Sequence, residues 1–172
     1  MSRRILIAGI GNIFHGDDAF GVEVARELGQ RSWPEGVQVM DFGIRGYDLA
    51  YALTDGYYAV ILVDAVPKGG AAGTTYLIEL DPEHLPESGP EGSDAHSLHP
   101  LRALQMAQRL GRVEAKLFLV GCEPATLESE EGRMELSPAV RAAIPEARAM
   151  IEKMVSDLLG ENENVNAGFE PV

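Results

Sequence analysis

The clearest strand signal in this chain is the run Ala59-Val60-Ile61-Leu62-Val63, which ends at Asp64. Apolar residues at every position indicate a strand that is buried on both faces, because a half-exposed strand would alternate with polar residues. Such a strand lies inside a sheet that is covered by helices on both sides. The run therefore constrains the chain to an α/β fold and places the Asp64 carboxylate at the boundary of the hydrophobic core.

Strand and helix signals alternate along the chain. Apolar runs predict further strands at 4–8, 37–40, 74–80 and 116–120. Helical spacing and capping residues predict helices at 20–28, 47–53, 98–110 and 138–159, the last with a break at Pro145. The predicted fold is a three-layer α/β sandwich, with a mixed, mostly parallel sheet of about five strands and helices on both faces.

Three connections refine this picture. The linker 67–73 carries no helix signal, so strand 74–80 is expected to pair antiparallel. The strand 37–40 is expected to deliver Asp41 into a turn over 41–43. The segment 81–94 is rich in Pro, Gly, Glu and Ser, which predicts a long exposed loop, and such loops are often functional.

Composition limits the location and the partners. The chain of 172 residues predicts one domain over 1–160, followed by a disordered acidic tail over 161–172. A net charge of −13 argues against nucleic acid and against insertion into an anionic membrane. One cysteine permits no internal disulfide, and no apolar stretch approaches the roughly 20 residues that cross a bilayer. We expect a cytoplasmic protein.

Three carboxylates follow predicted strands. Asp18 comes after the first strand, Asp41 ends the second and Asp64 ends the third. Sites in parallel sheets form at the carboxyl ends of strands, although a single Asp at such a place is as often a helix cap or turn former. Asp64 needs a donor or a cation to offset its desolvation. The adjacent pair Asp17-Asp18 would be unfavourable without a similar partner.

Histidines offer a third kind of ligand. His96 and His99 flank the start of the helix after the long loop, whereas His15 lies in the turn before Asp17-Asp18 and His84 lies in the acidic loop. One imidazole with two carboxylates suits zinc, nickel or manganese and leaves coordination positions open for a substrate. From the residues alone, a polar cap is the commoner role for His96 and His99. His84 is expected to be solvated, and His15 is expected to line the site without binding a metal.

Several motifs carry a resemblance to a known family. The run from Gly9 to Gly21, GIGNIFHGDDAFG, resembles the opening signature of the hydrogenase maturation proteases. Further matches follow in order: DFGIRG at 41–46, VDA at 63–65, SDAH at 93–96, GCEP at 121–124 and LSP at 136–138. The resemblance covers about 4–151. Ala19 departs from the Gly of many members.

The resemblance implies an activity and a ligand set. It implies an endopeptidase that removes a C-terminal peptide from the large-subunit precursor of a nickel–iron hydrogenase after nickel insertion. Carried over by position, the nickel ligands are Asp18, Asp64 and His96, which are also the predicted catalytic residues, with Asp41 in a supporting role. The nickel is expected to be that of the substrate, and another divalent metal can occupy the site in vitro.

Three other interpretations remain open. A hydrolase would use Cys122 as nucleophile and His96 as base, although a lone cysteine after an apolar strand is usually a core residue. A nickel-binding assembly chaperone would share all three ligands but would not cut the precursor. A nucleotide-binding module is weak, since Phe14 stands where the dinucleotide fingerprint requires glycine and two acids follow.

Overall fold

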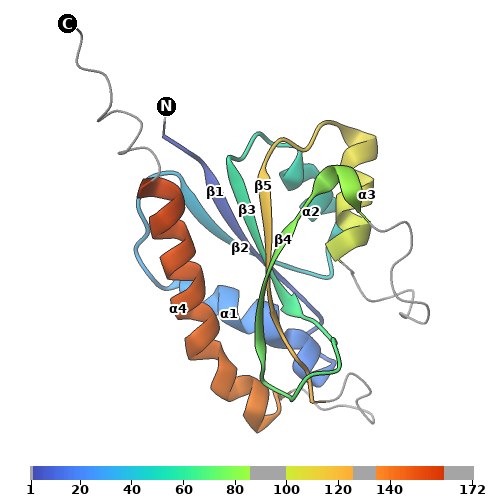
Figure 1. Ribbon diagram of the computed structural model, residues 1–172, viewed down its shortest axis with the longest axis vertical. Helices are drawn as coiled ribbons and strands as arrows, with labels where there is room; N and C mark the ends of the chain where they lie inside the picture. Colours follow the sequence, from blue (N-terminus) through green and yellow to red (C-terminus); the bar gives the residue numbers. More distant parts are fainter. Residues whose placement is uncertain (1, 86–99, 126–134, 161–172) are drawn as a thin grey trace, which may run out of the picture.

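A computed structural model describes residues 2–85, 100–125 and 135–160, which form a five-stranded sheet with helices on both sides (Figure 1). The strand order is β2-β1-β3-β5-β4. The strands are β1 (Ile5–Ile10), β2 (Val37–Gly43), β3 (Ala59–Ala65), β4 (Thr75–Leu80) and β5 (Lys116–Cys122). The helices are α1 (Phe20–Gly29), α2 (Gly46–Leu53), α3 (Pro100–Leu110) and α4 (Pro138–Gly160), with short 3-10 turns η1 (Gly16–Ala19) and η2 (Pro82–His84).

Strand β3 lies in the middle of the sheet, as its apolar run predicted. All seven of its residues are buried, and it pairs in parallel with β1 on one side and β5 on the other. Strand β4 pairs antiparallel with β5, which confirms the expectation from the helix-free linker. The sheet is therefore mixed and mostly parallel.

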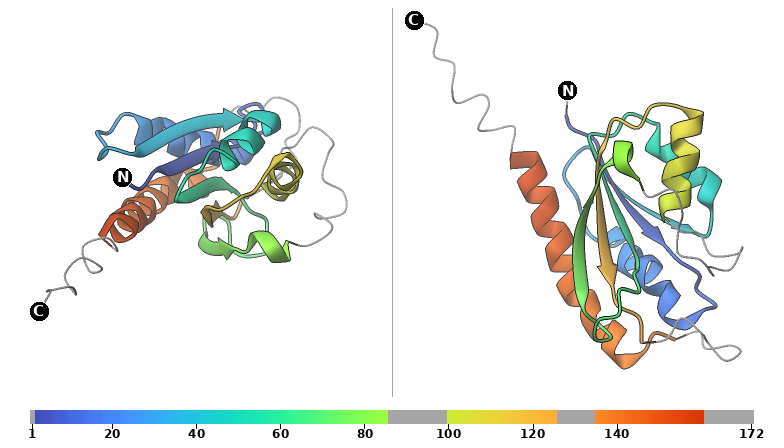
Figure 2. Two further views of the ribbon diagram at one scale, coloured as in Figure 1. Left: turned by 90° about the horizontal axis from the view of Figure 1, so that it is seen from above. Right: turned by 45° about the vertical axis from the view of Figure 1, so that its right-hand side comes forward.

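Two layers of helices cover the sheet, one on each face. Figure 2 shows α1 and α4 on one side and α2 and α3 on the other. Alternate residues of β1 enter the two cores, with Ile5 and Ile7 facing α1 and α4, and Leu6 and Ala8 facing α2 and α3. The period of two along each strand divides its apolar residues between the two cores.

Two local predictions are wrong. The turn expected over 41–43 is part of β2, which pairs with β1 through a register irregularity where Gly9 faces Asp41 and Ile10 faces Gly43. Such an irregularity lets a strand continue through residues that resemble a turn. Helix α4 does not break at Pro145. Pro145 lies on the exposed face, and the buried positions on both sides of it hold the helix against the sheet.

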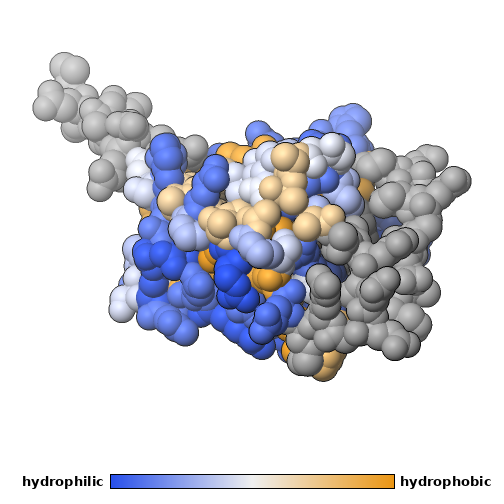
Figure 3. All heavy atoms as spheres, turned by 90° about the horizontal axis from the view of Figure 1, so that it is seen from below, coloured by the Kyte–Doolittle hydropathy of each residue, from blue (hydrophilic) through white to orange (hydrophobic). Residues whose placement is uncertain are grey.

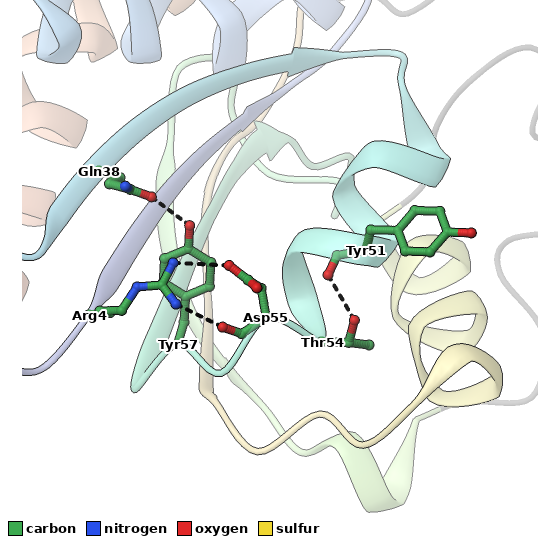
Figure 4. Close-up of polar contacts among 6 residues, drawn as sticks. All are labelled: Arg4, Gln38, Tyr51, Thr54, Asp55 and Tyr57. Carbon is green, nitrogen blue, oxygen red and sulfur yellow. Dashed lines mark hydrogen bonds and ion pairs between the residues drawn. The ribbon is translucent and has the colours of Figure 1, made fainter.

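Polar contacts connect the strands at the end of the sheet where the parallel strands begin (Figure 4). The Arg4 guanidinium donates to the backbone carbonyl of Asp55 at 2.8 Å and to its carboxylate at 3.0 Å, and the Tyr57 hydroxyl donates to Gln38 at 2.6 Å. The start of β1 is thus tied to the turn before β3, and β2 is tied to the same turn. The parallel strands end at the opposite side of the sheet, which carries Asp18 and Asp64.

Some predictions lie outside the described residues. These are His96 and His99, most of the loop 81–94 and the tail 161–172, so the tail and the domain boundary at 160 stay predictions. Within the described ranges, no helix is both long and apolar enough to cross a membrane.

Candidate functional site

The order of the strands places the candidate site. From β1 the chain moves outward to β2 and then returns across β1 to β3, so the order reverses between β1 and β3. Ligands in open α/β sheets bind in the crevice outside the carboxyl ends of the strands at such a reversal. Asp18 follows β1 and Asp64 is near the end of β3, and the two acids therefore lie on either side of this crevice.

Glycines allow the chain to close around this point. A Cβ on Gly21, at the start of α1, would lie 2.0 Å from the carbonyl oxygen of Val63 and 2.3 Å from that of Ile10. Gly11 has φ +143°, and a Cβ there would lie 1.8 Å from the carbonyl oxygen of Asp18. Only glycine permits these approaches. The signature glycines thus serve close packing of α1 and η1 against the ends of β1 and β3.

Asp64 is buried with little compensation. Its side chain is 6% exposed, and within the described residues its carboxylate accepts one hydrogen bond, from its neighbour Ala65 at 2.9 Å. Burial raises the pKa of Asp64 well above its usual value, and the charge of Asp18 raises it further. A buried carboxylate that faces a second carboxylate is stabilised by a bound cation.

Asp18 is held by the loop that follows β1. Its carboxylate accepts a hydrogen bond from the backbone N–H of Asn12 at 3.0 Å. Burial raises the pKa of Asp18, although the Asn12 hydrogen bond and the nearby His15 act in the opposite direction. Asp18 thus lies on η1, which packs against β3, the strand that carries Asp64. Carboxylate oxygens on neighbouring elements suit a divalent metal.

Asp17 differs from its neighbour, a distinction that the sequence did not reveal. Its carboxylate is 3% exposed and accepts three hydrogen bonds from a distant part of the chain. The donors are the backbone N–H of Ala125 at 2.8 Å, that of Ser137 at 2.6 Å and the hydroxyl of Ser137 at 2.9 Å. These donors satisfy Asp17, which is therefore not available to a cation in the way that Asp18 is.

Glu123 is a second buried acid that sequence reasoning missed as a site residue. It is 5% exposed and accepts hydrogen bonds from the backbone N–H of Lys68 at 2.8 Å, that of Gly69 at 3.0 Å and the hydroxyl of Tyr76 at 2.8 Å. Burial alone would raise the pKa of Glu123, but these donors lower it. Glu123 thereby fixes the loop that follows β3 and Asp64.

Asp41 does not reach Asp64. It faces Gly9 of β1, which in turn faces Val63 of β3, so it lies two strand spacings, about 10 Å, from that position. Its carboxylate accepts a hydrogen bond from Gly43 at 2.9 Å, and its carbonyl accepts one from Arg45. Asp41 thus belongs to a neighbouring feature rather than to the pair of acids.

That neighbouring feature is a groove beside the loop that holds Asp18. It encloses about 300 Å³ and has two strongly exposed apolar side chains on its rim, Phe14 at 59% and Ile44 at 54%. Asn12, Asp41 and Arg45 also line it. Figure 3, which looks onto the carboxyl ends of the strands, shows hydrophobic residues in the middle of this face with hydrophilic residues beside them. A concave groove with apolar walls and a few polar groups is the usual form of a ligand site.

Cys122 is poorly suited to be a nucleophile. It has 0% exposure and lies within β5, packed in the core beneath α4. Burial raises the pKa of its thiol to about 11, with further contributions from Asp17, Glu123 and Glu146. A nucleophilic cysteine is accessible and has a lowered pKa, so Cys122 is better explained as a core residue.

The histidines fall into two groups. His15 is exposed at the start of η1, where its side chain caps no backbone group, and exposed His84 pairs with Asp81 at 2.6 Å. His96, the predicted third ligand, lies outside the described residues. Among the residues that the structure does describe, no three His, Cys, Asp or Glu side chains come together as a metal site. The ligand set of Asp18, Asp64 and His96 therefore stays a prediction.

The fold and the carboxyl ends of its strands define an α/β protein with two acids, buried Asp64 and half-buried Asp18, at the switch point of its strand order. The model of the hydrogenase maturation protease family matches residues 22–154, and the chain therefore belongs to that family of peptidases.

Relatives and solved structures agree with this assignment. The chain is 33% identical over 145 residues to the hydrogenase 2 maturation protease of Escherichia coli, covering 84% of this chain and 85% of that protein. It is 34% identical over 143 residues to the hydrogenase expression/formation protein HupD of Bradyrhizobium diazoefficiens, covering 82% and 72%. The structure of the hydrogenase maturating endopeptidase HybD from E. coli superposes with a TM-score of 0.75 at 30% identity, covering 90% of this chain and 93% of that one.

Proposed function

We propose that this peptidase removes a C-terminal peptide from the nickel-loaded large-subunit precursor of a nickel–iron hydrogenase. In this reaction the nickel belongs to the substrate. Asp18, Asp64 and His96 bind it in an open ligand set, so that cleavage waits until the metal is in place. The two carboxylates and the imidazole recognise the metal centre, and the rest of the precursor docks beside them.

The observation that carries the proposal is the pair formed by Asp18 and Asp64. Two acids lie on contacting elements at the switch point, one of them is buried, and the described residues give each carboxylate one backbone donor. The neighbouring acid Asp17 receives three donors over a similar depth of burial. The contrast supports a cation between Asp18 and Asp64, because an unpaired buried charge is costly.

The groove beside the pair supports a peptide substrate. It is lined by Asn12, whose backbone N–H also donates to Asp18, and by the segment from Asp41 to Arg45. A segment of the precursor that enters this groove would contact Phe14 and Ile44 while its metal centre contacts the acids. In this arrangement Asp41 supports the reaction by shaping the groove and orienting the substrate.

Nickel binding to metal-stripped protein is the first test. Calorimetry is performed on the wild type, on Asp18→Asn, Asp64→Asn and His96→Ala, and on Asp157→Asn as a control. Asp157 is an exposed acid of α4 that pairs with Lys153, and its loss should not affect the site. We expect one ion per chain in the wild type and the control, and none in the three ligand variants. Equal binding by all five proteins would refute the ligand assignment.

Cleavage of the precursor separates an enzyme from a non-cleaving nickel chaperone. Purified nickel-loaded precursor and nickel-free precursor are each incubated with the protein, and loss of the C-terminal peptide is followed by mass spectrometry. We expect processing of the nickel-loaded form alone. Binding of the loaded precursor without processing would favour the chaperone.

A further inference from the structure

Asp17 connects three segments that are far apart in the sequence. The carboxylate lies in η1, just before α1, and its donors lie on the segment after β5 and at the start of α4. Ala125 is 108 residues away and Ser137 is 120 residues away. Ser137 also precedes Pro138, the first residue of α4, and its hydroxyl accepts a weak hydrogen bond from Val140 at 3.4 Å. Asp17 therefore fastens η1 to the amino-terminal end of α4.

The geometry of a 3-10 turn links Asp17 to Asp18. Successive side chains in such a turn point about 120° apart around its axis, because it has 3.0 residues per turn. Asp17 is directed toward α4, and the next residue, Asp18, is directed toward Asn12. The turn that carries both acids packs against β3, the strand of Asp64. Fixing the carboxylate of Asp17 fixes the orientation of the turn, and with it the direction of Asp18.

The chemistry of the contact requires a carboxylate. Three donors converge on the two oxygens of Asp17, and all of them are N–H or O–H groups. An asparagine would present one acceptor oxygen and an NH₂ group that itself donates, so at least one backbone N–H would lose its partner. The start of α4 also favours negative charge through the helix dipole.

We propose that Asp17 is a positioning residue for the metal site, which holds η1 and Asp18 against β3, the strand that carries Asp64. The proposal rests on the function proposed above, since it concerns the metal that Asp18 and Asp64 bind. Asp17 itself contacts neither the metal nor the substrate. It acts through η1, and Ser137 is the partner that makes this possible.

The test compares metal binding with stability in the full chain. The variants are Asp17→Asn, Ser137→Ala and Ser137→Thr, and the control is Glu27→Gln. Glu27 of α1 pairs with Arg148 of α4 at 2.5 Å, so its substitution loosens contact between the same two helices away from η1. Thermal unfolding measures stability, calorimetry measures Ni²⁺ affinity, and the visible spectrum of the Co²⁺-loaded protein reports the geometry of the ligands.

The expected pattern separates positioning from simple stabilisation. Asp17→Asn should lower Ni²⁺ affinity roughly 10- to 100-fold, the range found when partners of metal ligands are removed. Its Co²⁺ spectrum should change. Ser137→Ala should lower the Ni²⁺ affinity and change the Co²⁺ spectrum in the same direction, but by less. Ser137→Thr keeps the hydroxyl and should restore the wild-type affinity and spectrum. Glu27→Gln should lose stability with unchanged affinity and spectrum.

Two other results would overturn different statements. If Ser137→Ala and any folded Asp17→Asn protein bind Ni²⁺ with wild-type affinity and spectrum, the positioning role is refuted while the metal site stands. If the wild type itself binds no Ni²⁺, the proposed function is refuted. Should Asp17→Asn fail to fold, the Ser137 pair still decides, because Ser137→Ala removes one of the three hydrogen bonds of Asp17.

Discussion

Gly21 lies directly against the carbonyl oxygen of Val63, the residue that precedes Asp64. A Cβ on Gly21 would come within 2.0 Å of that oxygen. Real Cβ atoms do not approach backbone oxygens so closely, so any larger residue would push α1 away from the ends of β1 and β3. The contact sets the distance between the helix that follows Asp18 and the strand that carries Asp64.

We therefore expect Gly21→Ala to destabilise the protein by about 1–3 kcal/mol or more, and to weaken metal binding. The matched control is Gly29→Ala at the other end of α1, where a Cβ would meet nothing within 4 Å. That substitution should be neutral or should stabilise by up to about 1 kcal/mol. Urea unfolding measures the free energy of unfolding of both variants. Similar losses of stability in both would show that the contact between Gly21 and Val63 tolerates a Cβ.

Removal of the Asp64 charge should stabilise the metal-free protein. Its raised pKa means that the folded state binds a proton more readily than the unfolded chain does. The stability that this proton provides is complete below the ordinary pKa of 3.8 and is lost as pH rises through the higher native pKa. Asp64→Asn stays neutral, so its advantage over the wild type in unfolding free energy should grow with pH.

The measurement is urea unfolding in chelator between pH 4 and pH 8. The same variant should fail to bind Ni²⁺, so that it gains stability and loses the site together. A constant difference between the two proteins across this range would mean that Asp64 carries no raised pKa.

Cys122→Ala should retain cleavage of the nickel-loaded precursor. The thiol is buried and its pKa is about 11, so almost no thiolate exists near neutral pH. The substitution leaves a small gap in the core and should cost about 1 kcal/mol. Processing is measured with precursor in excess at a temperature well below unfolding. Loss of cleavage with intact Ni²⁺ binding would instead support the cysteine hydrolase.

Glu123→Gln should loosen the loop that follows β3. The carboxylate of Glu123 accepts hydrogen bonds from Lys68, Gly69 and Tyr76 with its two oxygens. The amide of glutamine has one acceptor oxygen, so a buried donor is left unpaired at a cost of about 1–3 kcal/mol. Hydrogen exchange at Lys68 and Gly69 should accelerate. Glu79→Gln, on the exposed side of β4, is the control and should leave exchange unchanged.

The same residue predicts the behaviour of the protein in acid. Glu123 has a lowered pKa, so it stabilises the fold above its ordinary pKa of 4.5, and this contribution is lost as pH falls through the lower native value. Glu123→Gln should therefore differ most from the wild type near neutral pH and least in strong acid. An equal difference at all pH values would show that charge is not involved.

Local patterns predicted much of the architecture. The apolar run of β3 indicated a central strand, and all seven residues of that strand are buried. Helix α1 followed from Phe20, Val24 and Leu28, whose spacing of four places them on one buried face. Two predictions failed where packing outweighed a local signal. Pro145 lies inside α4, and Asp41 to Gly43 continue β2.

The sequence by itself determined the fold class, the family resemblance and the candidate acids Asp18 and Asp64. Each of these depends on apolar periodicity or on a short motif, and both are formed by residues that are close together in the chain. Only the tertiary structure distinguished Asp17 from Asp18 and gave Glu123 a role. The donors of Asp17 lie more than 100 residues away, and those of Glu123 lie about 50 residues away. No local pattern specifies such partners, since it is the order of the strands and the packing of α4 that bring them together.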